Sequence, residues 1–298
     1  MNIYSAISAN IWKSYLILFL FIIFAGTVAY VIGRATDYGP GLGVVIFIIS
    51  IFYSFFSYYY SDKMVLAASG AKHIEEKDHP KLFHLVENLS IAGGVPMPKV
   101  YIMDDPSPNA FATGRDPKHA AVAVTTGILE KLSKSELEGV LAHELSHVKN
   151  YDTRLLAITA VLVGFIALIT DLFLRHVFWS GLGNRDRDAR GQMIFFIVAI
   201  VLAILAPVVA SLIQLAISRK REFLADASGA LLTRYPEALA SALEKISSNP
   251  QPLKTATNAT AHLFIVNPFK GKGFSGWLSG LFSTHPPIEE RVKILRSM

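Results

Sequence analysis

Cysteine is absent from the 298 residues of the chain, which excludes disulfide bonds and thiolate metal ligands. Any metal ion must therefore be held by histidine, aspartate or glutamate. Charged residues are also scarce: they make up 17% of the chain, whereas an average soluble protein carries about 25%. Apolar residues account for 52% and are concentrated in long runs, which indicates an integral membrane protein. The net charge of +5 is modest, so we expect basic residues to face anionic lipid rather than nucleic acid.

Four apolar runs contain no charged residue: residues 14–33, 41–60, 155–170 and 193–218. A helix needs about 20 apolar residues to cross a bilayer, so these runs predict four transmembrane helices. The third run is the shortest and reaches full length only if Asp171 lies at the membrane interface. The first run is longer than the apolar core of a signal peptide and is closely followed by the second, so we interpret it as a membrane anchor.

The runs divide the chain into four parts: two spans in 1–60, a polar segment in 61–154, two spans joined by a short loop in 155–218, and a polar segment in 219–298. Because two spans separate the polar segments, both segments should lie on the same side of the membrane. More lysines and arginines flank the spans on that side than on the other, which favours the cytoplasmic side. We therefore expect a multi-pass protein of the cytoplasmic membrane.

Residues 143–147 form the most informative motif, His-Glu-Leu-Ser-His, or H-E-x-x-H. Residues four apart share one face of a helix, so His143 and His147 can bind one metal ion while Glu144 holds a water molecule. Without context, the same letters describe two solvated histidines on an exposed helix turn. The context favours an amphipathic helix, because Ser133 and Glu136 have the spacing of a capping box. Apolar residues then recur at helical spacing, namely Leu137, Val140, Leu141, Leu145 and Val148.

A catalytic zinc ion needs a third protein ligand, and Glu222 is the candidate. Asp226 lies four residues later on the same helix face, where it can accept the free ring N–H of a ligating histidine. The alternative is a solvated acid pair that offsets three adjacent basic residues, and the local sequence leaves both interpretations open. Topology favours the ligand, because two intervening spans bring Glu222 back to the side of His143 and His147.

Elsewhere, the sequence predicts a mainly α-helical fold with a small β-sheet. We expect helices at 80–92, 219–233 and 236–246, and strands at 99–103, 110–113 and 120–125. Residues 247–283 are rich in glycine, proline, asparagine and serine, which suggests an irregular insertion or a lid. Its aromatic residues could enter the membrane interface, cover a cleft or simply pack on the domain.

Three motifs occur together in this order: H-E-x-x-H at 143–147, Glu222 with Asp226, and Thr284-His285-Pro286-Pro287 with Arg291. With residues 108–114, they resemble the M48 family of zinc metallopeptidases, and within it the HtpX-like membrane proteases, over nearly the whole chain. The resemblance implies a gluzincin-like α+β domain, one Zn²⁺ per chain and an endopeptidase of the cytoplasmic membrane. It also implies a role in stress response and in the quality control of misfolded or damaged membrane proteins, with polypeptides and the lipid bilayer as partners.

The resemblance also implies roles for further residues. Asn109, Ala110 and Phe111 would lie on a substrate-binding edge strand, while His285 and Arg291 would line the cleft and contact substrate or the developing oxyanion. Interpreted without the resemblance, Asn109 is a turn residue after Pro108, and the His-Pro-Pro segment is the stiffened start of a helix.

These residues predict a mechanism in which Glu144 takes a proton from zinc-activated water and returns it to the leaving amine. Four other interpretations compete with it. A transporter would carry ionisable groups inside its spans, and an intramembrane protease would have its motif inside an apolar run; neither fits this chain. A prenyl-protein-type M48 protease needs more spans around a large chamber. A non-catalytic zinc scaffold stays open, although it would leave Glu144 without a purpose.

Overall fold

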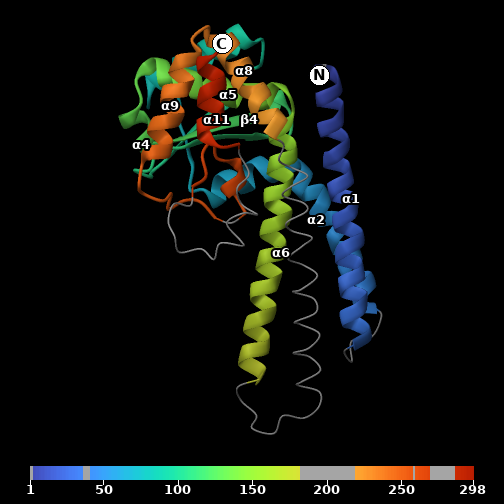
Figure 1. The fold of residues 1–298 in the computed structure, drawn as a ribbon. Coiled ribbons are helices and arrows are strands. Elements are labelled where there is room, and N and C mark those ends of the chain that lie inside the picture. Colours follow the sequence, from blue (N-terminus) through green and yellow to red (C-terminus); the bar gives the residue numbers. More distant parts are fainter. Residues whose placement is uncertain (1–2, 36–40, 182–218, 258, 269–285) are drawn as a thin grey trace.

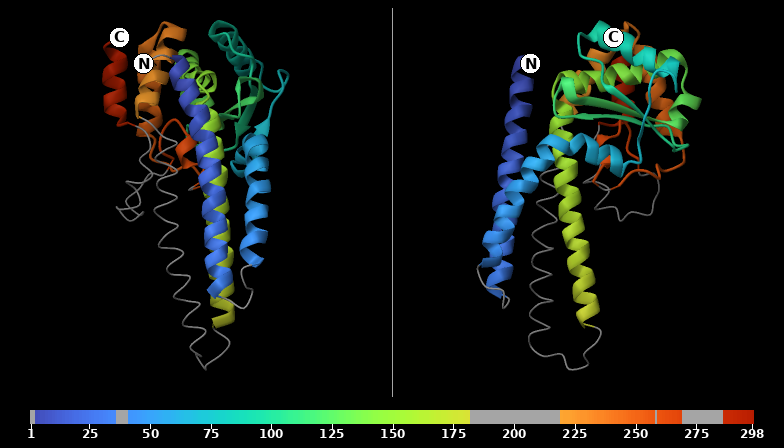
Figure 2. Two further views of the ribbon diagram at one scale, coloured as in Figure 1. Left: turned by 90° about the vertical axis from the view of Figure 1, so that its right-hand side faces the viewer. Right: turned by 180° about the vertical axis from the view of Figure 1, so that it is seen from behind.

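The computed structural model describes residues 3–35, 41–181, 219–257, 259–268 and 286–298. A globular domain and several long helices make up this part of the chain, and the helices project from one side of the domain (Figure 1). The long helices are α1 (Ile3–Ala35), α2 (Gly41–Ala68) and α6 (Asp152–Gly181). Helix α1 begins beside the globular domain and runs away from it, α2 runs back, and α6 runs outward again (Figures 1 and 2).

Apolar side chains cover the outside of the long helices, as expected for a surface that faces lipid. Trp12 on α1 is 74% exposed and Phe52 on α2 is 70% exposed, which would be unfavourable in water. Within the described residues, Ile7–Thr27 is long and apolar enough to cross a membrane by itself. Helix α5 and the first part of α6 satisfy the same test only as a pair, and the two are bent by 84° at their junction.

Two of the other expected spans fall within longer helices. Residues 41–60 form part of α2 and residues 155–170 form part of α6. The fourth run, 193–218, lies outside the described residues. The expected mainly helical fold with a small sheet is confirmed, and the described residues confirm one helix that meets the criteria for a span.

The described residues of the globular domain include a four-stranded mixed sheet in the order β1-β2-β4-β3. Strands β2 (Lys99–Met103) and β4 (Ala120–Thr125) have the predicted bounds and pair in parallel. Strand β3 (Ala110–Gly114) pairs antiparallel with β4 and lies at one edge. Strand β1 (Lys72–His73) pairs antiparallel with β2 at the other edge and was not predicted.

Helices α3 (Pro80–Gly93) and α5 (Lys134–Lys149) precede and follow the larger strands, with η1 (Pro117–His119) and α4 (Thr126–Lys131) as short connections. The capping box predicted for α5 is present: the Glu136 backbone N–H donates to Ser133 Oγ, and the Ser133 backbone N–H donates to the Glu136 carboxylate. These two bonds satisfy backbone N–H groups that would otherwise have no partner at the start of the helix. The motif therefore lies on a well-capped helix.

The second polar segment covers α5 with α8 (Arg219–Thr233) and α9 (Pro236–Ser248), and continues through η2 (Ala261–Leu263) to α11 (Ile288–Arg296). Gly229 on α8 allows a close approach to α5, because a Cβ atom there would lie 3.0 Å from the His143 backbone nitrogen. This contact brings the two halves of the predicted site together.

Candidate metal centre

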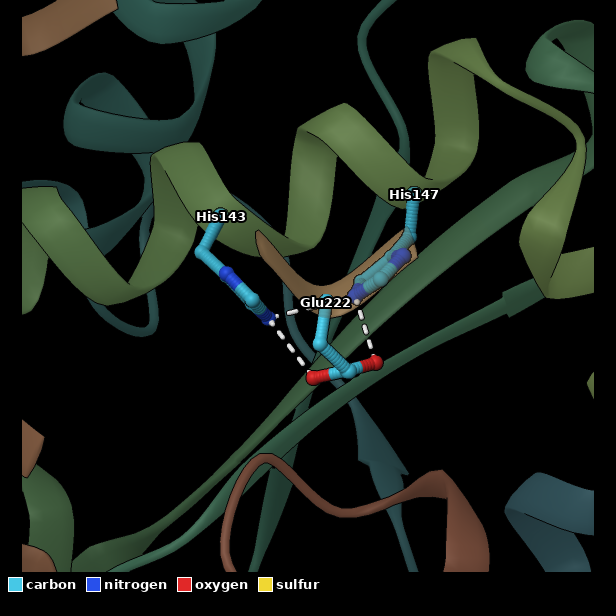
Figure 3. Close-up of side chains that lie close together, drawn as sticks. All are labelled: His143, His147 and Glu222. Carbon is cyan, nitrogen blue, oxygen red and sulfur yellow. Dashed lines mark hydrogen bonds and ion pairs between the residues drawn. The ribbon is translucent and has the colours of Figure 1, made fainter. Parts of the chain in front are cut away.

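His143 and His147 project from the same face of α5, and Glu222 projects toward them from α8 (Figure 3). The Nε2 atoms of the two histidines are 3.1 Å apart. The Glu222 carboxylate oxygens lie 3.8 Å from His143 Nε2 and 3.5 Å from His147 Nε2. All three residues are buried. Two segments distant in the sequence, α5 and α8, thus supply one group of three potential metal ligands.

The group fits a zinc ion. Two ligand atoms of a tetrahedral zinc site, with bonds of about 2.1 Å, lie about 3.4 Å apart, close to the three distances observed here. Two imidazoles and one carboxylate form a known catalytic donor set, and this set leaves one position open. Within the described residues, this is the group of histidine, aspartate and glutamate side chains that meets the distance condition for a metal site. A narrow cavity of about 10 Å³ lies against all three residues, which is space for about one water molecule.

Glu144 lines the same cavity and is 2% exposed. Burial and, to a smaller extent, the nearby Glu222 carboxylate raise the pKa of Glu144, whereas His147 lowers it, and the result is a pKa of about 7. The backbone N–H of Ala112 on β3 donates to the Glu144 carboxylate and partly offsets this increase. A carboxylate whose pKa lies near neutrality is suited to accept and return a proton, which is what a general base must do.

Asp226 lies behind His143, as predicted. Its Oδ1 atom is 2.9 Å from His143 Nδ1, in an ion-pair contact that is not aligned as a hydrogen bond. Burial by itself raises the pKa of Asp226, but Arg291 outweighs burial and holds that pKa at about 2. Asp226 therefore stays ionised beside His143, and the free Nε2 of His143 faces the metal position.

Arg291 has a different environment from the one expected of a residue that contacts substrate. It is completely buried, and its Nε and Nη2 atoms donate to the two carboxylate oxygens of Asp226 at 2.8 and 2.7 Å. Its Nη1 atom also donates to the Ile265 carbonyl and lies 3.8 Å from Glu222. Arg291 thus links α11 to the carboxylates of Asp226 and Glu222. This buried location suits a residue that positions other side chains.

Asp152 is a neighbour of His147 that the sequence analysis missed. Its Oδ2 atom is 2.9 Å from His147 Nδ1. Since a carboxylate can only accept, Nδ1 carries a proton, and Nε2 is the nitrogen left to face the metal position. Burial by itself lowers the pKa of His147, but Glu222 and Asp152 raise it to about 9. A metal ion must therefore displace a proton from Nε2 on binding. In the sequence, the only sign of this contact was that Asp152 lies five residues after His147.

Asn109, Ala110 and Phe111 are all buried; Ala110 and Phe111 lie on the edge strand β3, and Asn109 precedes it. Asn109 Nδ2 donates to the Val266 carbonyl, and the Ile265 N–H donates to the Ala110 carbonyl, so part of the strand edge is already paired with residues 265–266. Phe111 packs against Phe264, with ring centroids 5.1 Å apart. Ala112, between these contacts and Gly114, lines the cavity.

His262 also lines the cavity and was not predicted. It comes from η2, within the segment expected to be irregular, and its Nε2 atom lies 3.1 Å from the Leu156 carbonyl on α6. No periodicity or motif marked this histidine in the sequence. His285 lies outside the described residues. Pro287 is the N-cap residue of α11, which begins at Ile288, so a helix does follow the His-Pro-Pro segment.

Comparisons with known proteins agree with the geometry. Residues 76–298 match the model of "Peptidase family M48". The chain is 50% identical over 295 residues to a "Protease HtpX homolog" of Dictyoglomus thermophilum, covering 99% of this chain and 94% of that protein. It is 48% identical over 296 residues to the homologue of Tropheryma whipplei strain Twist, covering 99% and 98%. The crystal structure of S. mikatae Ste24p has a similar fold, with a TM-score of 0.50 and 20% identity, over 95% of this chain and 66% of that one.

Proposed function

Since the chain belongs to peptidase family M48 and is a metalloprotease, we propose that it is a zinc endopeptidase of the cytoplasmic membrane that degrades misfolded or damaged membrane proteins. The observation that carries this proposal is the buried group of His143, His147 and Glu222, with Glu144 against the same cavity, in a chain with an apolar helix long enough to span a membrane.

In this proposal, His143, His147 and Glu222 hold the zinc ion. When bound, zinc supplies a Lewis acid that lowers the pKa of water toward 7 and polarises a peptide carbonyl. Glu144 accepts the proton of the attacking water and delivers it to the nitrogen of the leaving amine. Asp226 and Asp152 keep the imidazoles oriented from behind.

Arg291 and His285 take different roles. Arg291 is a positioning residue in our proposal, because its guanidinium is fully buried against Asp226. In the sequence, two prolines, Pro286 and Pro287, separate His285 from the start of α11. We assign to His285 the contact with substrate or with the developing oxyanion, as the family resemblance implies.

Substrate would add to the sheet at the edge of β3. Every second residue of β3 points its N–H and C=O groups away from β4. Among these residues, the Ala110 carbonyl accepts from the Ile265 N–H, and the Gly114 carbonyl accepts from the Thr153 hydroxyl. Ala112 lies between them and lines the cavity, which makes its carbonyl the natural pairing partner for a substrate backbone. Residues 261–266 would then have to move away from β3 for a long polypeptide to bind, as expected of a lid.

The membrane arrangement completes the proposal: four spans, within 1–60 and 155–218, with both catalytic segments, 61–154 and 219–298, in the cytoplasm. The direction of α1, α2 and α6 supports it, because α1 and α6 leave the globular domain and α2 returns to it (Figures 1 and 2). Cleavage would then occur next to the membrane surface, where the cytoplasmic parts of a misfolded membrane protein are accessible.

The test is proteolysis by the detergent-purified protein of two substrates, unfolded casein and a destabilised membrane protein, with Glu144→Gln as the inactive control. We expect the wild type to cleave both, and a chelator to abolish cleavage. Faster cleavage of the destabilised membrane protein than of its stable parent would support the quality-control role, and equal rates would contradict it. If the protein binds zinc but cleaves neither substrate, the endopeptidase proposal would be wrong and a non-catalytic zinc scaffold would be favoured.

A further inference from the structure

The turn between α5 and α6 returns the chain to the metal centre. Helix α5 ends at Lys149, Tyr151 adopts a left-handed conformation with φ of 60°, and α6 leaves at 84° to α5. This conformation is unfavourable for a bulky residue, so the surrounding contacts must maintain it. Its result is that Asp152, the first residue of α6, lies against His147 rather than pointing into solvent.

The second oxygen of Asp152 faces α1. Asn10 Nδ2 donates to Asp152 Oδ1 at 2.7 Å and to the Asn150 carbonyl at 3.0 Å. Arg221 Nη1 donates to Asn10 Oδ1 at 3.0 Å and lies 3.3 Å from Asp152 Oδ1. Asn10, Asp152 and Arg221 are 3%, 2% and 8% exposed. One carboxylate is therefore shared between a potential zinc ligand and residues of α1 and α8.

The position of Asn10 is notable because it lies within the apolar segment Ile7–Thr27. A buried amide in such a segment needs hydrogen-bond partners, and the two acceptors of Asn10 Nδ2 belong to the turn that carries Asp152. A carboxylate that accepts the ring N–H of a ligating histidine fixes the tautomer and the orientation of that ring. The amide of Asn10 in turn fixes the rotation of the carboxylate.

We propose that Asn10 is a positioning residue of the metal centre, so that α1, through Asp152, determines how firmly His147 holds the metal ion. The chain of contacts runs from Asn10 Nδ2 to Asp152 Oδ1, and from Asp152 Oδ2 to His147 Nδ1. A change in the packing of α1 then changes metal retention without touching a ligand. The inference rests on the proposed zinc site, and it gives α1 a role in positioning one ligand of that site.

The test is the rate at which zinc leaves the full-length, detergent-purified protein in the presence of a colorimetric chelator. Asp152→Ala should release zinc about 10 to 100 times faster than the wild type, the usual effect of losing such a partner. Asn10→Ala should release it roughly 2 to 10 times faster, because one hydrogen bond to a charged group is lost. Ser14→Ala is the matched control: Ser14 is a buried polar residue one turn along α1 that donates to the Asn10 backbone carbonyl. This control should release zinc at the wild-type rate.

The double variant separates a positioning role from simple packing. If Asn10 acts through Asp152, Asn10→Ala should add nothing to the release rate in the Asp152→Ala background. A wild-type rate in Asn10→Ala, or an equal additional increase in the double variant, would overturn the inference. Asn10→Leu, which keeps the branched shape of the asparagine side chain but can neither donate nor accept a hydrogen bond, serves the same comparison if Asn10→Ala fails to fold.

Failure of the zinc site itself looks different. Wild-type protein that binds no zinc would overturn the proposed function and this inference together. Wild-type protein that binds zinc and cleaves casein, with Asn10→Ala releasing zinc no faster, would overturn only the inference.

Discussion

The two histidines of the metal centre have the same chemistry but are supported by different parts of the molecule. Behind His143, Asp226 on α8 is fixed by Arg291 on α11, so this support lies entirely within residues 219–298. Behind His147, Asp152 at the start of α6 is held by Asn10 of α1 and by Arg221. One support belongs to the globular domain alone, and the other connects the domain to the long apolar helices.

This difference suggests how a membrane metalloprotease can couple its site to its surroundings. The support of His143 contains a fully buried guanidinium and should respond mainly to the stability of the domain. The support of His147 depends on the position of α1 and should respond to the packing of the apolar helices. Removing one partner at a time from each support tests this distinction.

The largest effect is expected when the support of His143 loses Arg291. Arg291→Met leaves Asp226 buried without its cation, and removing one partner of a buried ion pair costs about 3–5 kcal/mol. We expect a large fall in the thermal unfolding midpoint of the detergent-purified protein, even without metal. Arg296→Met is the control on the same helix: Arg296 pairs with Glu237 and Glu244 at the surface, and its loss should change the midpoint much less. Equal shifts for the two variants would contradict the domain-only support of His143.

A smaller effect is expected at the contact between α8 and α5. In Gly229→Ala, the new Cβ would meet backbone atoms of His143 and Ala142 at 3.0 to 3.3 Å. Overpacking of this kind costs about 1–3 kcal/mol. We expect weaker zinc binding as well, because α8 carries both Glu222 and Asp226.

Gly164→Ala is the matched control for this variant, since its Cβ would lie at an ordinary 3.6 Å from Ala259 Cβ. It should bind zinc as tightly as the wild type when both are titrated by isothermal calorimetry. Unchanged zinc affinity in Gly229→Ala would contradict the claim that the close approach of α8 and α5 sets the ligand geometry.

The smallest effect on the metal centre is expected outside both supports, at the capping box of α5. Burial by itself raises the pKa of Glu136, but hydrogen bonds from Lys245 and Ser241 outweigh burial and lower it to about 2. Since the folded-state pKa is depressed, the stabilisation is present above the unfolded pKa of about 4.5 and is lost as the pH falls toward 2.

Glu136→Gln should therefore lower stability by about 1–3 kcal/mol at pH 7 and by progressively less as the pH falls from about 4.5. Thermal unfolding of both proteins across this range measures the difference. Zinc occupancy at pH 7 should be unchanged in the variant. A loss of zinc would show that the start of α5 also controls the metal centre. It would contradict the view that the two supports alone position the histidines.

Local patterns accounted for much of the fold. The bounds of β2, β4 and α8 were predicted correctly because each is marked by its own apolar pattern and flanking residues. The cap at Ser133 was predictable for the same reason, since a capping box is written in four consecutive residues. Strand β1 was missed because its two residues form a strand only through pairing with β2.

The metal centre shows the same division. His143, Glu144 and His147 were found from one motif, and Glu222 from its spacing to Asp226 and from topology. The contacts of Arg291, Asp152 and His262 could not be predicted, because each depends on where an element distant in the sequence packs. Sequence therefore identifies the potential metal ligands more readily than the residues that hold those ligands in place.

The most direct test of the central claim is the zinc content of two matched variants, Glu144→Gln and Glu222→Gln, after dialysis. Both changes convert a buried carboxylate at the same cavity into an amide of the same shape. If Glu222 is a ligand and Glu144 is the general base, Glu144→Gln should keep about one zinc per chain and lose cleavage by about 10²- to 10⁴-fold, while Glu222→Gln should lose most of its zinc. Full zinc in Glu222→Gln, or cleavage at the wild-type rate by Glu144→Gln, would contradict the account.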